Sequence, residues 1–198
     1  IKIDSELKAK GTLFALAATA RHALAGLGNK LPSLIIGHGV LGRLLARLTI
    51  AAGGEPPTVW ESNPLRVGHQ TDYNVIDPLK DSSADHAAIY EASGDISVLD
   101  KIIPKLKKNG EIVLAGFYSS PISFAFPPAF MREARFRISA EFNTEDINIT
   151  RSLLETGALS LEGLISHEKN VNSSKAAYKQ SFEDPECLKM VIDWREVA

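Results

Sequence analysis

The chain has 198 residues, a formal net charge of −2 and 44% hydrophobic residues. That length allows one well-buried domain with part of a second, and the small net charge gives no electrostatic case for binding nucleic acid or an anionic membrane surface. Cys187 is the only cysteine, so an intramolecular disulfide and a cysteine-rich zinc cluster within the chain are excluded.

The apolar segments are too interrupted to predict a transmembrane helix, which needs about 20 mostly apolar residues. Arg21 and His22 interrupt the stretch 13–27, and two arginines interrupt the stretch 34–52. The first residues, IKID, include no methionine and do not form a signal peptide. We therefore expect a cytoplasmic protein, or a fragment of one.

Strands and helices alternate up to residue 116. Leucine and alanine recur at helical spacing over 5–27, which predicts one helix ended by Gly26 and Gly28. The other elements expected in this part are helices at 40–52 and 98–106 and strands at 34–36, 58–60, 73–76, 87–90 and 111–115. This alternation predicts an α/β fold in which a doubly wound parallel sheet is built from right-handed βαβ units.

The pattern changes after Gly116. The expected elements are strands at 123–126, 137–142, 164–167 and 190–194, with helices at 146–156 and 175–182. We expect Pro127 and Pro128 to form the turn between the first two of these strands. The two strands then make an exposed edge that invites pairing across a two-fold axis, so a homodimer is expected.

Three glycines with the spacing G-x-G-x-x-G lie between the strand at 34–36 and the helix at 40–52. Gly37 permits a tight turn, Gly39 leaves room for a pyrophosphate, and Gly42 lets the helix pack closely on the strand. The free N–H groups and the positive dipole of the helix then face the phosphates. The motif predicts a dinucleotide site, although an ordinary tight turn is the alternative interpretation.

Glu61 ends the second strand, 19 positions after Gly42. Its carboxylate is suited to accept hydrogen bonds from a ribose 2′-hydroxyl and to repel a 2′-phosphate, which favours NAD over NADP. Arg66 opposes that inference if it turns back towards a phosphate. An S-adenosylmethionine-dependent methyltransferase also has a glycine loop and such an acid. These enzymes usually carry another acid near the end of the first strand, where this sequence has only Leu-Ile-Ile.

Four segments resemble the medium-chain dehydrogenase/reductase superfamily: GTLFALAATARHAL (11–24), LIIGHGVLG (34–42), YEASG (90–94) and GEIVLAGFY (110–118). Motif and resemblance together predict that NAD contacts Thr19, Gly37, His38, Gly39, Val40, Leu41, Gly42, Glu61, Asn63, Arg66, Ser93, Gly94, Gly116, Phe117 and Tyr118. The resemblance also implies a Rossmann-type domain with segments of an incomplete GroES-like catalytic domain. The expected limits are 1–29 for the leading helix, 30–143 for the NAD-binding domain and 144–198 for the C-terminal return.

A narrower resemblance covers nearly the whole chain. It is carried by LPSLIIGHGVLGRLLARL, VWESNPLR, AGFYSSPISFAFPPAFMREARFRISAEF and CLKMVIDW. These segments resemble superfamily members that act in bacteriochlorophyll synthesis. The resemblance implies NAD-dependent oxidation of a 3-(1-hydroxyethyl) group on a bacteriochlorophyllide-type chlorin to 3-acetyl. A non-catalytic NAD-binding module is the alternative from another functional class.

The proton acceptor for such an oxidation is not assigned. We expect the His38 side chain to point to solvent, His22 to line a helix contact and His167 to end a late strand. Tyr118 is expected near the nicotinamide, with a packing role as the alternative, and Glu91 is expected to be structural. Where superfamily members bind zinc, the ligands lie in the catalytic part that precedes this sequence, so we expect no metal here. Aromatic residues after the fifth strand form either a packing surface or a wall against a flat macrocycle: Phe117, Tyr118, Phe124, Phe126 and Phe130, with Met131.

Overall fold

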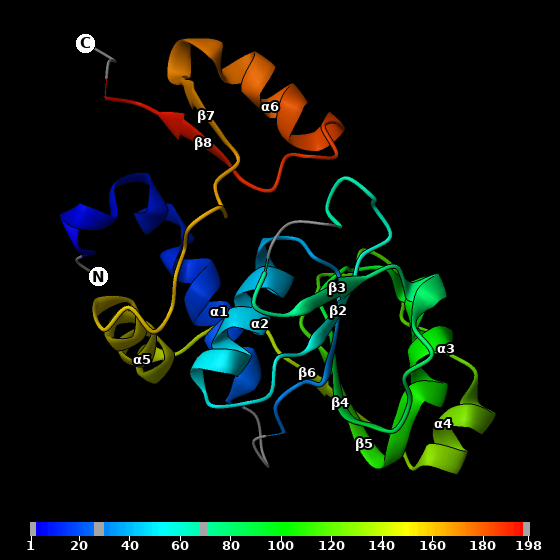
Figure 1. Cartoon of the computed structure of the whole chain (residues 1–198). Coiled ribbons are helices and arrows are strands. Elements are labelled where there is room, and N and C mark those ends of the chain that lie inside the picture. Colours follow the sequence, from blue (N-terminus) through cyan, green and yellow to red (C-terminus); the bar gives the residue numbers. More distant parts are fainter. Residues whose placement is uncertain (1–2, 26–29, 68–70, 196–198) are drawn as a thin grey trace.

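The computed structural model describes residues 3–25, 30–67 and 71–195 (Figure 1). A six-stranded sheet has the order β3-β2-β1-β4-β5-β6, and all of its strand pairs are parallel. The strands are β1 (Leu34–Ile36), β2 (Thr58–Trp60), β3 (Asn74–Ile76), β4 (His86–Glu91), β5 (Leu106–Leu114) and β6 (Arg135–Ile138). This is the doubly wound order, so the predicted α/β fold is confirmed.

Helices cover both faces of the sheet (Figure 1). The first face carries α1 (Phe14–Leu24), α2 (Val40–Ala51) and α5 (Thr144–Glu155); the second carries α3 (Leu99–Ile102) and α4 (Phe126–Arg132). Successive residues of β1 serve opposite faces: Ile35 packs with the leucines of α2, whereas Leu34 and Ile36 pack with α3. All three residues are buried, as expected for a central parallel strand.

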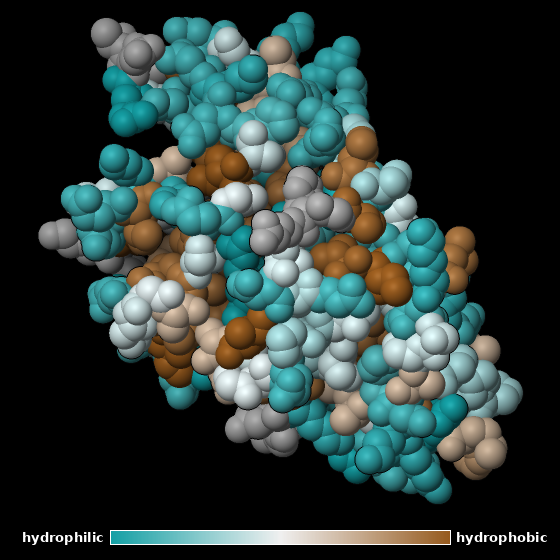
Figure 2. All heavy atoms as spheres, in the orientation of Figure 1, coloured by the Kyte–Doolittle hydropathy of each residue, from teal (hydrophilic) through white to brown (hydrophobic). Residues whose placement is uncertain are grey.

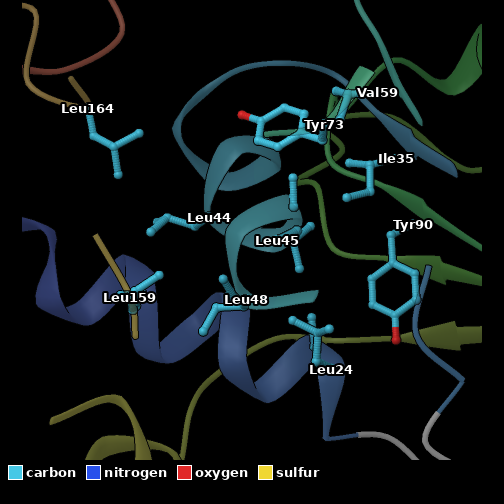
Figure 3. Packing of buried hydrophobic residues seen from close by; sticks show 14 of the residues in the cluster. Leu24, Ile35, Leu44, Leu45, Leu48, Val59, Tyr73, Tyr90, Leu159 and Leu164 are labelled. Carbon is cyan, nitrogen blue, oxygen red and sulfur yellow. The ribbon is translucent and has the colours of Figure 1, made fainter. Parts of the chain in front are cut away.

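The core between α1, α2 and the sheet is built from leucine and alanine (Figure 3). Leu44, Leu45 and Leu48 of α2 are buried, and Leu24 of α1 joins the same cluster. The predicted helix at 40–52 is therefore confirmed, and its leucines lie on the buried side. Because this packing fixes α2 against β1, it also fixes the glycine loop that joins them.

The predicted helix over 5–27 is wrong in its first half. Ser5–Leu13 forms a 3₁₀ segment in which Lys8 has φ 48° and ψ −130°, and only Leu13 is buried there. An exposed segment lacks the tertiary packing that stabilises most helices. The regular helix α1 begins at Phe14, and the predicted stop at Gly26 and Gly28 lies outside the described residues.

The predictions around Pro127 and Pro128 are also wrong. The two prolines occupy the first turn of α4, so the predicted strand at 123–126 and its turn are not found. Proline fits this place because the first N–H groups of a helix need no intrahelical partner. The next strand is β6 rather than 137–142, and the helix expected at 98–106 is divided into short turns with α3 in the middle.

The C-terminal unit, as we call residues 167–193, is a βαβ unit with its own sheet (Figure 1). β7 (His167–Asn170) pairs in parallel with β8 (Met190–Asp193), and α6 (Ser174–Glu183) connects them. The strand predicted at 164–167 begins three residues later, whereas the predicted helix at 175–182 is confirmed. The surface of this unit is mostly hydrophilic (Figure 2). The domain limits at residues 29 and 143 stay a prediction.

No helix within the described parts of the chain is long and apolar enough to cross a membrane.

A chain of polar side chains joins the amino ends of β1 and β4. Ser83 Oγ donates to Asp81 at 2.8 Å, so it accepts from Nε2 of His86 at 3.0 Å. In the neutral imidazole, Nδ1 of His86 then accepts from Ser33 Oγ at 2.8 Å. Both ring nitrogens of His86 are therefore engaged in its neutral form.

We expect His86 to make the free energy of unfolding depend on pH. Burial lowers the pKa of His86 below its ordinary value of about 6.5. The unfolded chain therefore binds the proton at higher pH than the folded chain. The contribution to stability is complete above about pH 6.5 and is lost as pH falls towards the lower folded-state pKa. Urea denaturation of His86→Gln should show a flatter pH dependence over this range, and an unchanged slope would contradict the assignment.

Candidate cofactor-binding site

The glycine loop has two positions that exclude a side chain and one that leaves open space. A Cβ on Gly42 would lie 1.8 Å from the carbonyl oxygen of Gly37. Gly37 itself has φ 95°, and a Cβ there would lie 3.1 Å from Ser93. A Cβ on Gly39 would meet nothing within 4 Å among the residues that the structure describes. Gly37 and Gly42 thus shape the loop, while Gly39 leaves room above it.

The N-terminus of α2 faces this open space with Gly39 as its N-cap, and no side chain caps it. The first N–H groups of a helix have no intrahelical partner, and together with the helix dipole they favour an anion. The loop residues Val40 and Leu41 supply the first of these groups. The geometry fits the pyrophosphate of a dinucleotide, whose close approach a side chain at position 39 would block.

The expectation that the His38 side chain points to solvent is wrong, because His38 has 0% exposure. Its Nδ1 lies 2.9 Å from the carbonyl oxygen of Arg66 and its Nε2 lies 3.0 Å from the Tyr73 hydroxyl. A carbonyl oxygen can only accept, so Nδ1 carries a proton. Both ring nitrogens are engaged, and His38 braces the loop from within instead of serving as a proton acceptor.

Glu61 lies at the end of β2 and is 8% exposed. Its Oε2 accepts from the backbone N–H of His38 at 3.1 Å, and its Oε1 accepts from that of Asn63 at 2.8 Å. Each carboxylate oxygen has a second lone pair, so the group retains acceptor capacity for a ribose hydroxyl. The structure therefore joins the glycine loop and the acid, as the sequence motif predicts.

Arg43 and Tyr73 adjoin this loop, and sequence reasoning did not identify either as part of it. Arg43 is only 6% exposed; its Nε donates to the carbonyl oxygen of His38 at 3.0 Å. Burial lowers the pKa of Arg43 and raises that of Tyr73. Sequence spacing did not indicate the burial of Arg43, because the groups around it include Tyr73 and Glu61 from other parts of the chain.

The side chains of Asn63 and Arg66 bind the segment that precedes β8. Asn63 Nδ2 donates to the carbonyl oxygen of Pro185 at 3.2 Å. Arg66 Nε donates to the same oxygen at 2.8 Å, and its Nη2 donates to that of Cys187 at 3.4 Å. Their predicted contacts with the cofactor stay a prediction.

Glu91 organises the neighbouring strand ends as a buried acceptor with 0% exposure. It accepts from the N–H of Ser93 at 2.7 Å, from that of Gly94 at 3.3 Å, and from the hydroxyls of Ser93 and Tyr118. Burial and the bond to Glu91 raise the pKa of Tyr118, so this hydroxyl stays protonated and engaged. It is therefore unsuited to accept the proton of a substrate.

Close backbone packing brings the ends of β4 and β5 together at the same edge of the sheet. A Cβ on Gly94 would lie 2.8 Å from the carbonyl oxygen of Phe117, and one on Gly116 would lie 2.8 Å from the N–H nitrogen of Gly94. The Phe117 side chain is 91% exposed there. Ser93, Gly94, Gly116 and Phe117 thus lie together, whereas their contacts with a cofactor stay a prediction.

The other predicted residues lie on α1 and in the C-terminal unit. Thr19 donates to the carbonyl oxygen of Ala15 within α1, and its proximity to a nicotinamide stays a prediction. His22 Nδ1 lies 2.7 Å from Asp146, which is 1% exposed and joins α1 to α5. The expectation that His167 ends a strand is wrong, because it begins β7, where its ring contacts Ser166. The described part of the chain holds no group of three His, Cys, Asp or Glu residues that could bind a metal ion.

No family model matches the chain. It is 58% identical over all 198 residues to a 2-desacetyl-2-hydroxyethyl bacteriochlorophyllide A dehydrogenase of Cereibacter sphaeroides. It is 55% identical, over 98% of its length, to a protein of the same name from Rhodobacter capsulatus. The chain spans 62% of the length of each of these curated relatives.

Solved dehydrogenases share the fold at low sequence identity. L-idonate 5-dehydrogenase from Escherichia coli matches 94% of the chain and 57% of its own, with TM-score 0.83 and 20% identity. An Escherichia coli alcohol dehydrogenase in complex with NADH matches 98% of the chain and 62% of its own, with TM-score 0.80 and 17% identity. A Sinorhizobium meliloti protein described as a zinc-binding dehydrogenase, bound to NADP, matches 92% of the chain and 58% of its own, with TM-score 0.73 and 18% identity. The chain is therefore similar, over nearly its whole length, to the 2-desacetyl-2-hydroxyethyl bacteriochlorophyllide A dehydrogenases, and it shares the fold of these solved dehydrogenases.

Proposed function

We propose that this chain is the nucleotide-binding part of an NAD-dependent dehydrogenase that oxidises the hydroxyethyl group of a bacteriochlorophyllide to acetyl. The names of the two curated relatives support the substrate. The single observation that carries cofactor binding is the open space at Gly39, directly beside a buried Glu61 that is bonded to the same loop. A nicotinamide cofactor is also consistent with the NADH and NADP complexes of the structural neighbours.

In this mechanism the residues of the chain bind and orient the reactants. The N–H groups at the start of α2 hold the pyrophosphate, and Glu61 accepts hydrogen bonds from the ribose. When bound beside these residues, a nicotinamide cofactor would supply the acceptor for the hydride of the carbinol carbon. The hydroxyl proton must pass to an acceptor. His38 and Tyr118 are engaged in hydrogen bonds within the fold, which supports an acceptor outside this pair.

We further propose a preference for NAD over NADP. A 2′-phosphate beside Glu61 would meet a like charge. Arg66 would have to offset that charge, but its guanidinium donates to the carbonyl oxygens of Pro185 and Cys187. An Arg66 side chain held by the segment before β8 therefore supports NAD.

Titration of the chain with NADH, NADPH and S-adenosylmethionine tests this function through the fluorescence of Trp60, which precedes Glu61. We expect NADH to bind more tightly than NADPH. Glu61→Gln should weaken NADH binding by about 10-fold, because a neutral amide is a poorer acceptor for the ribose hydroxyls than a carboxylate. NADPH should lose less, since the like charge is removed.

Glu55→Gln, an exchange at an exposed position of the preceding loop, is the matched control and should leave both affinities unchanged. A folded chain that binds S-adenosylmethionine alone would favour the methyltransferase interpretation. A chain extended to the length of the curated relatives is used for the activity assay. If it binds NADH but does not oxidise a hydroxyethyl chlorin, the non-catalytic module is favoured.

We also propose a homodimer formed through β6, which is the last strand in the sheet order. The Ile138 side chain of β6 is 75% exposed. In α4, the helix that precedes β6 in the chain, the exposed apolar side chains are Phe126, Phe130 and Met131. An apolar groove of about 580 Å³ lies between these elements. Such a surface supports packing between subunits. The exposed Phe117, at the cofactor edge of the sheet, supports a separate role as a wall against the macrocycle. A mass of one chain in equilibrium sedimentation would contradict the dimer.

A further inference from the structure

We infer that Arg66 is a positioning residue that couples the ribose-binding acid Glu61 to the C-terminal unit. Cofactor binding at Glu61 and docking of the segment 184–188, which joins α6 to β8, then stabilise each other. This inference rests on the cofactor site proposed above, and it adds a physical connection between that site and a distant part of the chain.

The first half of the connection is a tight turn after β2. Glu61 accepts from the N–H of Asn63. The turn is closed by the N–H of Arg66, which donates to the carbonyl oxygen of Asn63 at 2.9 Å, and by the N–H of Leu65, which donates to Asn63 Oδ1 at 3.0 Å. His38 adds a second path, because its N–H donates to Glu61 and its ring to the carbonyl oxygen of Arg66. A shift of Arg66 must therefore disturb the Glu61 carboxylate.

The second half of the connection reaches the segment 184–188. The Arg66 guanidinium donates to two carbonyl oxygens of this segment, at Pro185 and Cys187, and Asn63 donates to the first of them. The segment is ordered by Asp184, which accepts from the N–H groups of Glu186 and Cys187. The planar guanidinium fork fixes the orientation of both partners, which a single flexible ammonium would not.

Two bonded ends make the coupling reciprocal. We expect the ordered turn after β2 to bind the ribose better than a loosened turn. Docking of the segment 184–188 then increases the affinity for the cofactor by some factor. Because coupling is reciprocal, the bound cofactor favours docking of this segment by the same factor. The segment has no predicted contact with the cofactor. Protection of its amides by the cofactor is therefore a readout that a purely local structural role of Arg66 does not produce.

Gln180 provides the matched control. Its Nε2 donates to Asp184 Oδ2 at 3.2 Å, so it holds the same segment from α6, within the C-terminal unit. Removing Gln180 loosens the segment without breaking the connection to Glu61. Removing Arg66 breaks the connection itself.

Hydrogen–deuterium exchange of the amides of Glu186 and Cys187, with and without saturating NADH, tests the inference. In the unmodified chain we expect NADH to slow this exchange by about 5-fold, at the lower end of usual coupling strengths. Gln180→Ala should exchange faster in both states and keep the NADH effect. Arg66→Ala should lose the effect and bind NADH more weakly by the same factor, and Arg66→Lys should recover part of both.

The inference is overturned if Arg66→Ala, saturated with NADH, keeps the full protection of these amides. If NADH binding is also weaker, Arg66 acts only as a direct contact to the cofactor. If NADH binding is unchanged, Arg66 has only a local structural role. An unmodified, folded chain that binds no NADH would overturn both the proposed function and this inference. Normal binding of NADH without any protection in the unmodified chain would overturn the inference alone.

Discussion

Gly42→Ala should destabilise the chain by about 3 kcal/mol or more, because its new Cβ would lie 1.8 Å from the carbonyl oxygen of Gly37. The atom that it meets belongs to the backbone of the glycine loop, so no side-chain rotation relieves the contact. α2 would have to move away from β1, which would disrupt the packing of its buried leucines. Urea denaturation followed by circular dichroism measures this loss directly.

Gly39→Ala is the matched control within the same motif. A Cβ at position 39 meets nothing within 4 Å in the described structure, and its φ of −74° suits any residue. We expect the free energy of unfolding to change by less than about 0.5 kcal/mol. NADH binding should nevertheless fall by at least about 10-fold, because the methyl group occupies the space assigned to the pyrophosphate. If the two variants unfold alike, the separate roles of these glycines are wrong.

Glu91→Ala should lower the free energy of unfolding by about 3–5 kcal/mol. The carboxylate is fully buried and accepts from two backbone N–H groups and two hydroxyls. Alanine would leave these part-buried donors without their acceptor. The loss would loosen the ends of β4 and β5, where Ser93 and Gly116 lie. Thermal and urea unfolding of the variant measure the effect.

Tyr118→Phe removes one of the donors to the buried Glu91 carboxylate. It removes a single hydroxyl and keeps the ring, so a loss of only about 1 kcal/mol is expected. Glu91→Gln should lie between the two variants, because an amide keeps one acceptor oxygen but turns an NH₂ group towards the other donors. A Glu91→Ala variant as stable as Tyr118→Phe would show that Glu91 does not organise this edge of the sheet.

Local spacing was sufficient to predict much of the fold and to identify the glycine loop and Glu61, which the structure brings together. The strands β1 and β2, the helix α2, the glycine loop and Glu61 all follow from patterns within a few residues, and the structure joins the loop to Glu61 as expected. The Pro127-Pro128 pair was misinterpreted because proline suits both a turn and the first turn of a helix. Only the docking of α4 on the sheet distinguishes these two outcomes.

By itself, the sequence determined the α/β alternation and the position of the glycine loop between β1 and α2, because each depends on residues close in the chain. Tertiary structure decided the burial of His38, whose ring partners Arg66 and Tyr73 lie 28 and 35 positions away. It also decided that Arg66 contacts Pro185 and Cys187, 119 and 121 positions away. Neither partnership leaves a periodic signal, since each side chain is polar and its environment is formed only when distant segments pack together.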